Sequence, residues 1–213
     1  MSKATEFVSI RPEEHFWVEI YHLMNSVVQP RPIAWISTVS EKGTYNLAPF
    51  SYFNLCSINP PVISNAIIYN RDGSEKDTLR NIKATGKYVV GNVSYENANS
   101  ANVSSAPFGP EVDEFVEADV AFIDRGPNEP RLIADSAVNF ICELNQTVKL
   151  GEGAGVGTLV LGNVKEILLS ESLSNLDWKK GLPPELLKNV GRMGADHYAK
   201  TSDLFQLGRP EKK

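Results

Sequence analysis

Apolar and polar residues alternate with a period of two in several stretches of the chain, which predicts a mainly β protein. The clearest stretch is 137–148, where one face of the predicted strand carries Val138, Phe140, Cys142 and Leu144. Short runs rich in apolar and β-branched residues predict further strands over 33–39, 61–69, 88–93 and 158–169. We expect a hairpin-type turn at Gly43 and a flexible hairpin loop at the LGEGAGVG sequence before the strand over 158–169.

One segment changes to helical spacing. Leu79 and Ile82 lie three residues apart, and Gly86 is placed to end a helix over 76–85. Ser74 and Asp77 have the spacing of a capping box, with Asp in place of the usual Glu. The polar stretch 97–115, which contains two prolines, predicts short helical turns and loop.

Short strands at close spacing, with one or two helices and no regular strand–helix alternation, predict a mainly β protein with flanking helices. This pattern favours an antiparallel barrel over a doubly wound sheet. The chain has 213 residues, of which 42% are hydrophobic and 22% charged, values typical of one globular domain. We therefore expect a single domain over 1–213, with an N-terminal arm over about 1–30 and a C-terminal arm over about 186–213.

The charge pattern restricts the classes of partner. The chain has 21 Lys and Arg against 26 Asp and Glu, a formal net charge of −5, and no segment concentrates basic residues. Since a nucleic-acid surface needs a basic patch, we predict no nucleic-acid partner. No apolar run approaches the roughly 18 residues of a membrane span, and no secretory leader pattern is visible, so we expect no membrane association and a cytoplasmic location.

Residue types that often carry catalysis form no recognisable constellation. The histidines His15, His22 and His197 lack metal-ligand spacing, so we predict no metal site. Cys56 and Cys142 lie far apart among apolar neighbours and are interpreted as reduced packing residues. Motifs of serine hydrolases and P-loop proteins are missing as well. Chemistry carried by a bound cofactor needs fewer protein groups, because the protein then mainly positions the reactive atom.

Two segments have the composition of a cofactor site. In Asn46 to Asn54, amide and hydroxyl side chains alternate with small and aromatic residues, which suits the edge and face of a planar heterocycle. In Arg71 to Thr78, two cations and two hydroxyls precede a predicted helix start, which suits a phosphate group. Taken alone, each segment is explained more simply, the first as a strand with an aromatic face and the second as a solvated loop with an N-cap. We expect Asp77 to cap the helix or to orient Lys76, since it repels an anion.

Several motifs in a common order resemble the flavin reductase-like family of FMN-binding split barrels. They are Arg31 to Thr38, Asn46 to Asn54, Ser57 followed by Asn59-Pro60-Pro61, and Lys76-Asp77-Thr78 followed by Asn81-Ile82. The resemblance is dense from Pro30 to Val93 and resumes at Gly191-Arg192-Met193-Gly194 with Tyr198. One departure is Ala195, where relatives often have glycine, and this leaves the backbone conformation of that turn open.

This resemblance implies a six-stranded antiparallel split β-barrel that works as a homodimer, with FMN bound near the subunit interface. It also implies that Arg192 and Tyr198 approach the site from the C-terminal arm. The residues implied along the ring and ribityl chain are Ser37, Thr38, Asn46, Ala48, Pro49, Ser51, Phe53 and Asn54. Those implied around the phosphate are Arg71, Ser74, Lys76, Asp77 and Thr78.

The leading functional hypothesis from the resemblance is an NAD(P)H-dependent flavin oxidoreductase. Hydride would pass from NADH or NADPH to flavin N5, with no catalytic side chain required. His197 is a candidate nicotinamide contact, although an ordinary surface or interface histidine is favoured. For Trp35, a buried strand aromatic is favoured over a ring stacked on flavin.

Two alternatives stay open at this level. A flavoredoxin-like electron carrier would bind FMN without its own NAD(P)H activity, and the sequence does not separate it from a reductase. A barrel that has lost flavin is opposed by the complete set of polar residues from Arg71 to Thr78. Either flavin hypothesis implies a protein partner, which would be an oxygenase or a redox protein.

Overall fold

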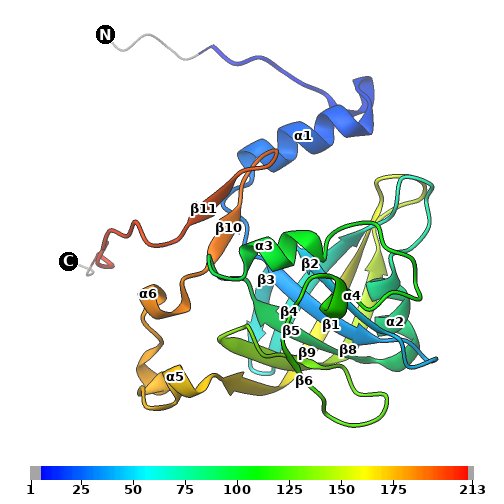
Figure 1. The fold of residues 1–213 in the computed structure, drawn as a ribbon. Helices are drawn as coiled ribbons and strands as arrows, with labels where there is room; N and C mark the ends of the chain where they lie inside the picture. Colours follow the sequence, from blue (N-terminus) through cyan, green and yellow to red (C-terminus); the bar gives the residue numbers. More distant parts are fainter. Residues whose placement is uncertain (1–5, 211–213) are drawn as a thin grey trace.

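The computed structural model describes residues 6–210 of the chain, and its main element is one antiparallel sheet (Figure 1). Among the described residues this sheet has seven strands, in the order β2-β1-β5-β8-β9-β4-β3. The strands, in chain order, are β1 (Ala34–Val39), β2 (Tyr45–Phe50), β3 (Phe53–Ile58), β4 (Pro61–Ile68), β5 (Lys87–Asn92), β8 (Val138–Lys149) and β9 (Gly157–Leu169).

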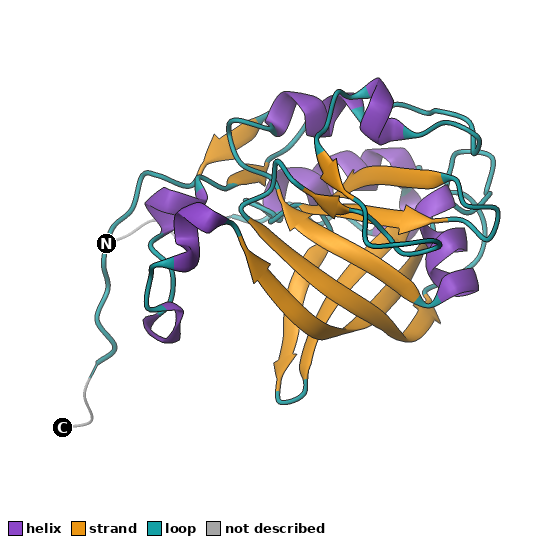
Figure 2. Ribbon diagram, turned by 60° about the horizontal axis from the view of Figure 1, so that its bottom comes forward, coloured by secondary structure: helices purple, strands orange, loops and turns teal. Residues whose placement is uncertain are grey.

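The edge strands of this sheet are neighbours in the sequence. Strands β2 and β3 lie at opposite ends of the strand order, yet only Ser51 and Tyr52 separate them. The sheet therefore curls into a barrel, as Figure 2 shows, and the chain crosses the open seam between its edges. At this crossing the Ala66 N–H donates to the Tyr52 carbonyl at 2.9 Å.

The expectation of six strands was wrong, although the antiparallel β architecture with flanking helices was predicted correctly. The sequence segment 46–54 was treated as one unit because its aromatic and polar residues form one motif. In the structure it belongs to two strands, since the backbone leaves β2 at Phe50 and enters β3 at Phe53. The extra strand is this second half, which pairs only with β4.

The helices and the small sheets surround the barrel. Helix α1 lies outside the barrel and beside the β10–β11 hairpin, so the two arms of the chain meet (Figure 1). No helix of the described residues is long and apolar enough to cross a membrane. The helices are α1 (Trp17–Val27), α2 (Asp77–Thr85), α3 (Ala98–Val103), α4 (Glu114–Glu117), α5 (Glu171–Ser174) and α6 (Pro184–Leu187), with 3-10 turns at Pro12–Glu14 and Trp178–Lys180. The small sheets pair β6 (Phe122–Ile123) with β7 (Leu132–Ile133) and β10 (Val190–Arg192) with β11 (Tyr198–Lys200).

Helix α2 begins one residue later than predicted and ends as predicted. Gly86 terminates it with a φ of 73°, a left-handed conformation that glycine adopts without a Cβ clash. The expected capping box is absent, because the N-cap residue is Lys76 and its side chain makes no capping hydrogen bond. Ser74 instead bonds within its own loop, where its hydroxyl donates to Asp72 at 2.6 Å.

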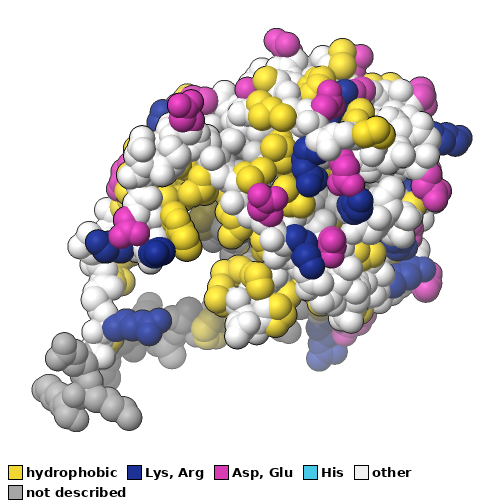
Figure 3. All heavy atoms as spheres, turned by 90° about the horizontal axis from the view of Figure 1, so that it is seen from below, with side chains coloured by type: hydrophobic (Ala, Val, Ile, Leu, Met, Phe, Trp, Pro, Cys, Tyr) yellow, Lys and Arg dark blue, Asp and Glu magenta, His cyan; other side chains and the backbone are white. Residues whose placement is uncertain are grey.

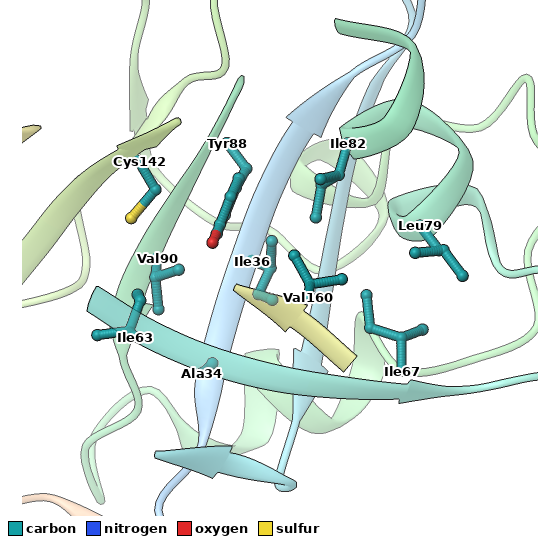
Figure 4. Packing of buried hydrophobic residues seen from close by; sticks show 10 residues of the cluster. All are labelled: Ala34, Ile36, Ile63, Ile67, Leu79, Ile82, Tyr88, Val90, Cys142 and Val160. Carbon is teal, nitrogen blue, oxygen red and sulfur yellow. The ribbon is translucent and has the colours of Figure 1, made fainter. Parts of the chain in front are cut away.

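The core has two parts because both faces of strand β1 are buried. Ala34 and Ile36 face the barrel interior with Tyr88 of β5, and Leu79 and Ile82 of α2 close one end (Figure 4). The outer face, which carries Trp35, is covered by α3, α4 and β7, which contribute the buried residues Ala101, Phe115 and Ile133. Strand β1 is therefore an apolar run with little alternation, as expected for a strand covered on both sides.

Trp35 is fully buried, and its indole N–H donates to the Ser104 hydroxyl at 3.0 Å, which confirms the interpretation of a buried strand aromatic. Cys142 is buried in the barrel core, as predicted. The packing role predicted for Cys56 was wrong, because this residue lies on the edge strand β3 with its side chain exposed. Apolar neighbours in sequence did not bury it, since the edge strand has no covering layer in this chain.

Candidate functional site

A cavity of about 340 Å³ lies where the β2–β3 crossing meets helix α1 and the loop before α2. We call it the cationic cavity, because Arg71 and Lys76 lie among its walls. Aromatic side chains from α1, from the end of β2 and from the segment after β4 also line it, and Ser51 and Tyr52 of the crossing complete this wall. The full lining is Trp17, Val18, Tyr21, His22, Pro49, Phe50, Ser51, Tyr52, Ala66, Ile68, Tyr69, Arg71 and Lys76.

The two cations of this cavity have unused donors. Within residues 6–210, Arg71 makes no ion pair or side-chain hydrogen bond, and its side chain is exposed. The half-buried Lys76 donates one hydrogen bond, from Nζ to the Asn70 side-chain oxygen at 3.1 Å, and an ammonium has three donors. Their charges are therefore available to an anionic group, in a protein whose net charge is −5.

The loop between these two cations is held by its own hydrogen bonds. The Ser74 N–H and hydroxyl both donate to Asp72, at 2.9 and 2.6 Å, and these bonds lower the pKa of the Asp72 carboxyl. Asp77 pairs with Arg80 one turn further along α2. Among the described residues its side chain makes neither a capping hydrogen bond nor an ion pair with Lys76, so both roles expected for it were wrong. A phosphate would thus meet Arg71 and Lys76 on a preformed loop, whereas the Ser74 hydroxyl already has a carboxylate partner.

A second cavity, of about 730 Å³, adjoins the cationic cavity. The two share the walls Trp17, Tyr21, Ser51, Tyr52 and Ile68. The adjoining cavity continues along helix α1 and past the start of β3, and its surface is mainly apolar. Its further lining residues include His15, Met24, Asn25, Val28, Arg31, Phe53, Asn54 and Gly155.

Other residues predicted for the site form a polar network at the α2 end of the barrel. Thr38 and Asn46 are paired across β1 and β2, and both are buried. Asn81 donates to the Thr38 hydroxyl at 3.0 Å, and Asn46 donates to the Thr78 hydroxyl at 2.9 Å. These four side chains attach helix α2 to the barrel, and none of them lines either cavity among the described residues.

Two buried polar side chains of the sheet have no hydrogen-bond partner in the described part of the chain. They are Ser37, on the outer face of β1, and Asn65, on β4. Ser37 was predicted as a site residue, and it shares the outer face of β1 with Trp35 rather than lining either of these cavities. Ala48 sits opposite Ile36 in the β1–β2 ladder and is half-buried.

A buried carboxyl group lies on the other side of strand β2. Glu114 of α4 is 7% exposed and accepts a hydrogen bond from the Leu47 N–H at 3.0 Å. Burial raises the pKa of Glu114 to about 7, an effect that the carboxylates of Asp77 and Asp113 reinforce and that its backbone hydrogen bonds oppose. Sequence reasoning gave no role to Glu114. It fixes β2 from outside the barrel.

The C-terminal residues predicted for the site do not line the cationic or the adjoining cavity within the described part of the chain. Arg192 lies over the Tyr198 ring, with 4.5 Å between its guanidinium carbon and the ring centroid. His197 is exposed, and its ring Nδ1 lies 3.2 Å from the Gly194 carbonyl within the same turn. Ala195 has a φ of 50°, so this turn adopts the left-handed conformation that glycine would provide. Among the described residues, none of these side chains lines the cationic or the adjoining cavity.

The main contribution that sequence reasoning missed is the wall provided by helix α1. The whole helix was treated as part of an N-terminal arm over about 1–30, although Trp17, Tyr21, Met24 and Val28 follow one another at helical spacing and line the adjoining cavity. Arg31 was part of a recognised motif but received no role. It is buried, and it lies at the junction of α1 with the crossing.

A third cavity, of about 830 Å³, opens at the end of the barrel opposite α2. It is mainly apolar, and residues from inside the barrel such as Ile63, Val90 and Phe140 form its floor. Leu55, Ile58 and Ile167 on its rim are more than half exposed. Figure 3 shows apolar side chains gathered on this lower side of the molecule.

Comparison with known proteins identifies one family and several similar proteins. Residues 24–184 match the family described as flavin reductase like domain. An uncharacterized protein of Halalkalibacterium halodurans is 30% identical over 205 residues, which cover 95% of this chain and 97% of that protein. An uncharacterized protein of Aquifex aeolicus is 34% identical over 183 residues, covering 85% and 89% respectively. The crystal structure of nitrilotriacetate monooxygenase component B from Bacillus cereus superposes with a TM-score of 0.87 at 29% identity, covering 96% of this chain and 100% of that chain.

Proposed function

The chain belongs to the flavin reductase-like family, and we propose that it is an NAD(P)H-dependent flavin oxidoreductase that uses FMN. The observation that carries this proposal is the cationic cavity, where an aromatic-lined space ends at two cations with unused donors. An aromatic surface next to a cationic end matches a flat ring system that carries a phosphate. The volumes of the two connected cavities, about 340 and 730 Å³, fall in the usual range of small-molecule sites.

Each part of the cavity has a distinct task in this proposal. Arg71 and Lys76 hold the phosphate, and Arg71 can do so bidentately through its planar guanidinium. Trp17, Tyr21 and Tyr52 form apolar walls that exclude water from the ring. The Ser51 hydroxyl faces the junction of the two cavities and is placed to hydrogen-bond the polar edge of the ring.

A bound flavin supplies the acceptor for the hydride of a reduced nicotinamide. The protein then needs to hold two rings in contact and to keep water out, and no side chain has to transfer a proton in that step. In this proposal the adjoining cavity receives the nicotinamide, because it shares one wall with the cationic cavity and is largely apolar. Phe53 and Asn54 at the start of β3 line the adjoining cavity and then contact the nicotinamide.

The proposal is tested by mixing the purified protein with FMN and either NADH or NADPH and following the absorbance of the reduced nicotinamide. We expect saturable oxidation that depends on both the protein and FMN. Absence of any acceleration by the protein with either nucleotide would reject the reductase assignment. The ratio of the two kcat/KM values would identify the physiological donor.

One observation favours a second candidate, a flavoredoxin-like electron carrier. Arg31 is the one Lys or Arg in the lining of the adjoining cavity among the described residues, and four of its five N–H donors are already engaged. The pyrophosphate of a nicotinamide dinucleotide therefore finds a single unused Lys or Arg N–H donor in that lining. Rapid reduction by NADH or NADPH in a stopped-flow trace supports the reductase, and reduction only by dithionite or a protein donor supports the carrier.

We propose a homodimer as the working form and an oxygenase as the class of protein that takes up reduced flavin. The exposed apolar rim at Leu55, Ile58 and Ile167 supports an interface, because large exposed apolar patches commonly mark binding surfaces. The similarity to a monooxygenase component supports the oxygenase. Light scattering of the purified protein at micromolar concentration tests the dimer, and a monomeric mass would reject it.

A further inference from the structure

One buried guanidinium connects three separate parts of the chain. Arg31 is 7% exposed, and its Nη1 donates to the carbonyl oxygens of Asn25 at 2.7 Å and Val28 at 2.8 Å, at the C-terminal end of α1. Its Nη2 donates to the Met193 carbonyl at 3.0 Å, and its Nε to the Ser51 hydroxyl at 3.3 Å. These groups belong to α1, the C-terminal arm and the β2–β3 crossing.

Helix α1 depends on this connection because its own burial is small. Of the eleven residues of α1, only Asn25 is buried. Trp17, Tyr21 and Met24 keep 43%, 45% and 51% of their surfaces exposed, so apolar contact with the barrel holds the helix weakly. Asn25 accepts a hydrogen bond from the Tyr52 hydroxyl at 3.1 Å and thereby extends the Arg31 connection to the crossing.

A second anchor lies at the other end of the helix. Trp17 packs so closely on Gly155 of the β8–β9 loop that a Cβ built there would lie 2.7 Å from the indole ring. Helix α1 thus spans both cavities and is fixed at its two ends, by an apolar contact at Trp17 and by polar bonds at Arg31.

The C-terminal arm closes around Arg31 from the opposite side. The Arg31 and Arg192 backbones exchange two hydrogen bonds, of 3.0 and 2.8 Å. A Cβ on Gly191 would lie 2.7 Å from the Pro30 side chain, and one on Gly194 would lie 3.0 Å from the Ser26 hydroxyl. Both glycines therefore permit the close approach that brings the Met193 carbonyl to the guanidinium.

We propose that Arg31 is a positioning residue of the flavin site, and that the Gly191–Gly194 turn serves to hold Arg31 and helix α1 rather than to contact flavin. Arg31 orients the Ser51 hydroxyl, and it fixes the helix that carries Trp17 and Tyr21 over the ring. The expected effect of Arg31 on flavin binding rests on the proposed function. The attachment of α1 itself is independent of any ligand.

The attachment is tested first without flavin, by hydrogen exchange of the α1 amides. In Gly191→Ala the added Cβ separates the arm from Pro30, and we expect exchange in α1 at least tenfold faster than in the unsubstituted protein. The matched control is Gly208→Ala in the same arm, where nothing lies within 4 Å of the added Cβ, and its exchange should not change. Equal protection of α1 in both variants would overturn the proposed role of the turn.

The positioning role is tested with FMN and Arg31→Lys, which keeps the charge but loses the planar set of donors. We expect FMN affinity to fall about tenfold and the residual fluorescence of bound FMN to rise at saturation, because Trp17 and Tyr21 no longer lie over the ring. The control is Arg131→Lys, which alters another largely buried guanidinium, placed between Tyr45 and Phe122 away from the cavities. It should lower Tm and leave both flavin readouts unchanged.

Two outcomes separate this inference from the proposed function. If the unsubstituted protein binds FMN and Arg31→Lys shows the same affinity and the same bound fluorescence, the positioning role is wrong while the flavin function stands. If the unsubstituted protein binds no FMN but Gly191→Ala still releases α1, the flavin function fails and the attachment by Arg31 stands. A Gly191→Ala protein with unchanged hydrogen exchange in α1 and unchanged FMN affinity rejects the proposed role of the Gly191–Gly194 turn.

Discussion

The polar residues near strand β2 form two groups that differ in their hydrogen bonding. In one group the side chains have partners within the protein, and in the other they have unused donors. At the α2 end of the barrel, Asn46 and Thr38 each have a side-chain partner on α2, Thr78 and Asn81 respectively, and all four are buried. At the cationic cavity, Arg71 has no partner within residues 6–210, and Lys76 uses one of three donors. The first group and Lys76 belong to the motifs that carry the family resemblance, and only the second group has free hydrogen-bonding capacity.

These motifs therefore combine residues that build a site with residues that bind in it. A buried polar side chain with a complete set of partners stabilises the fold, and replacing a partner by a ligand would require breaking an existing bond. An unpaired cation at the end of an aromatic cavity costs little while hydrated and gains a partner on binding. We therefore expect substitutions in the first group to change stability and substitutions in the second to change affinity.

The largest expected effect is on FMN affinity in the double variant Arg71→Ala/Lys76→Ala. A hydrogen bond to a charged group contributes about 1.5–3 kcal/mol, so losing both cations should weaken FMN by about 3–6 kcal/mol. Lys76→Ala alone should account for about 1.5–3 kcal/mol of this loss. Fluorescence titration of FMN at constant ionic strength measures both values.

The matched control for this variant is Arg80→Ala/Lys83→Ala, which removes two positive charges from α2 that do not line the cavity. This control changes the net charge by the same amount as Arg71→Ala/Lys76→Ala, and it should alter FMN affinity by less than threefold. If the two double variants weaken FMN equally, long-range electrostatics rather than direct contact explains the effect. An unchanged affinity after loss of Arg71 and Lys76 would place the phosphate elsewhere.

The second prediction concerns the barrel-end group. Asn46→Ala removes the bond to Thr78 and leaves a buried hydroxyl without its donor, so we expect the free energy of unfolding to fall by about 2–3 kcal/mol. Denaturant unfolding followed by circular dichroism measures the change. At temperatures where the variant is folded, its FMN affinity should stay within threefold of the unsubstituted protein. A loss of affinity without a loss of stability would transfer Asn46 to the binding group.

The third prediction uses Glu114, which holds β2 from its outer face. Burial raises its folded-state pKa to about 7, above the ordinary value of 4.5, so the folded protein keeps a proton that the unfolded chain has lost. This carboxyl therefore lowers stability progressively as pH rises from about 4.5 to about 7, and the penalty is complete above that range. Glu114→Gln should remove the penalty and raise stability by about 1–2 kcal/mol at pH 8, with almost no gain at pH 4.5.

Urea unfolding of both proteins at pH 4.5 and pH 8 measures this difference. The amide side chain of the Glu114→Gln variant can still accept from the Leu47 N–H, so the experiment isolates the charge. A stability gain that is the same at both pH values would show that Glu114 is not protonated in the folded state near neutral pH. FMN affinity should not change, because Glu114 lines neither cavity.

The smallest expected effect lies in the C-terminal turn. Ala195 has a φ of 50°, and a left-handed conformation costs a residue with a Cβ about 1 kcal/mol. Ala195→Gly should recover part of this cost and raise the stability of the turn by about 0.5–1 kcal/mol. Hydrogen exchange of the Met193 and His197 amides should slow, since the Met193 N–H donates to the His197 carbonyl at 2.9 Å. Faster exchange in the variant would contradict the assigned strain.

The sequence predicted the barrel well where periodicity and burial act together. Strands β1, β4, β5, β8 and β9 and helix α2 lie within one residue of their expected bounds. The prediction was poorer at β3, which is an edge strand and pairs with β4 alone. Its apolar residues Leu55 and Cys56 are exposed, so the sequence does not alternate between buried apolar and exposed polar residues. It also missed α1, whose attachment relies on Arg31, Asn25 and Tyr52 rather than on a buried apolar face.

The candidate site shows the same limit. Composition and motifs brought Ser51, Arg71 and Lys76 into one predicted set, and the structure places them around one cavity. They could not distinguish these residues from Asn46 and Thr78, because hydrogen-bond satisfaction depends on which side chains meet in three dimensions. They also could not show that the Gly191–Gly194 turn packs on the segment from Ser26 to Pro30, which lies near the other end of the sequence.

The central claim is that this chain binds a flavin whose phosphate is held by Arg71 and Lys76. The most direct test compares the dissociation constants of FMN and riboflavin for the unsubstituted protein, since the two ligands differ only by the phosphate. The account predicts that FMN binds at least 100-fold more tightly, which corresponds to about 3 kcal/mol. Equal dissociation constants, or no binding of either ligand, would contradict it.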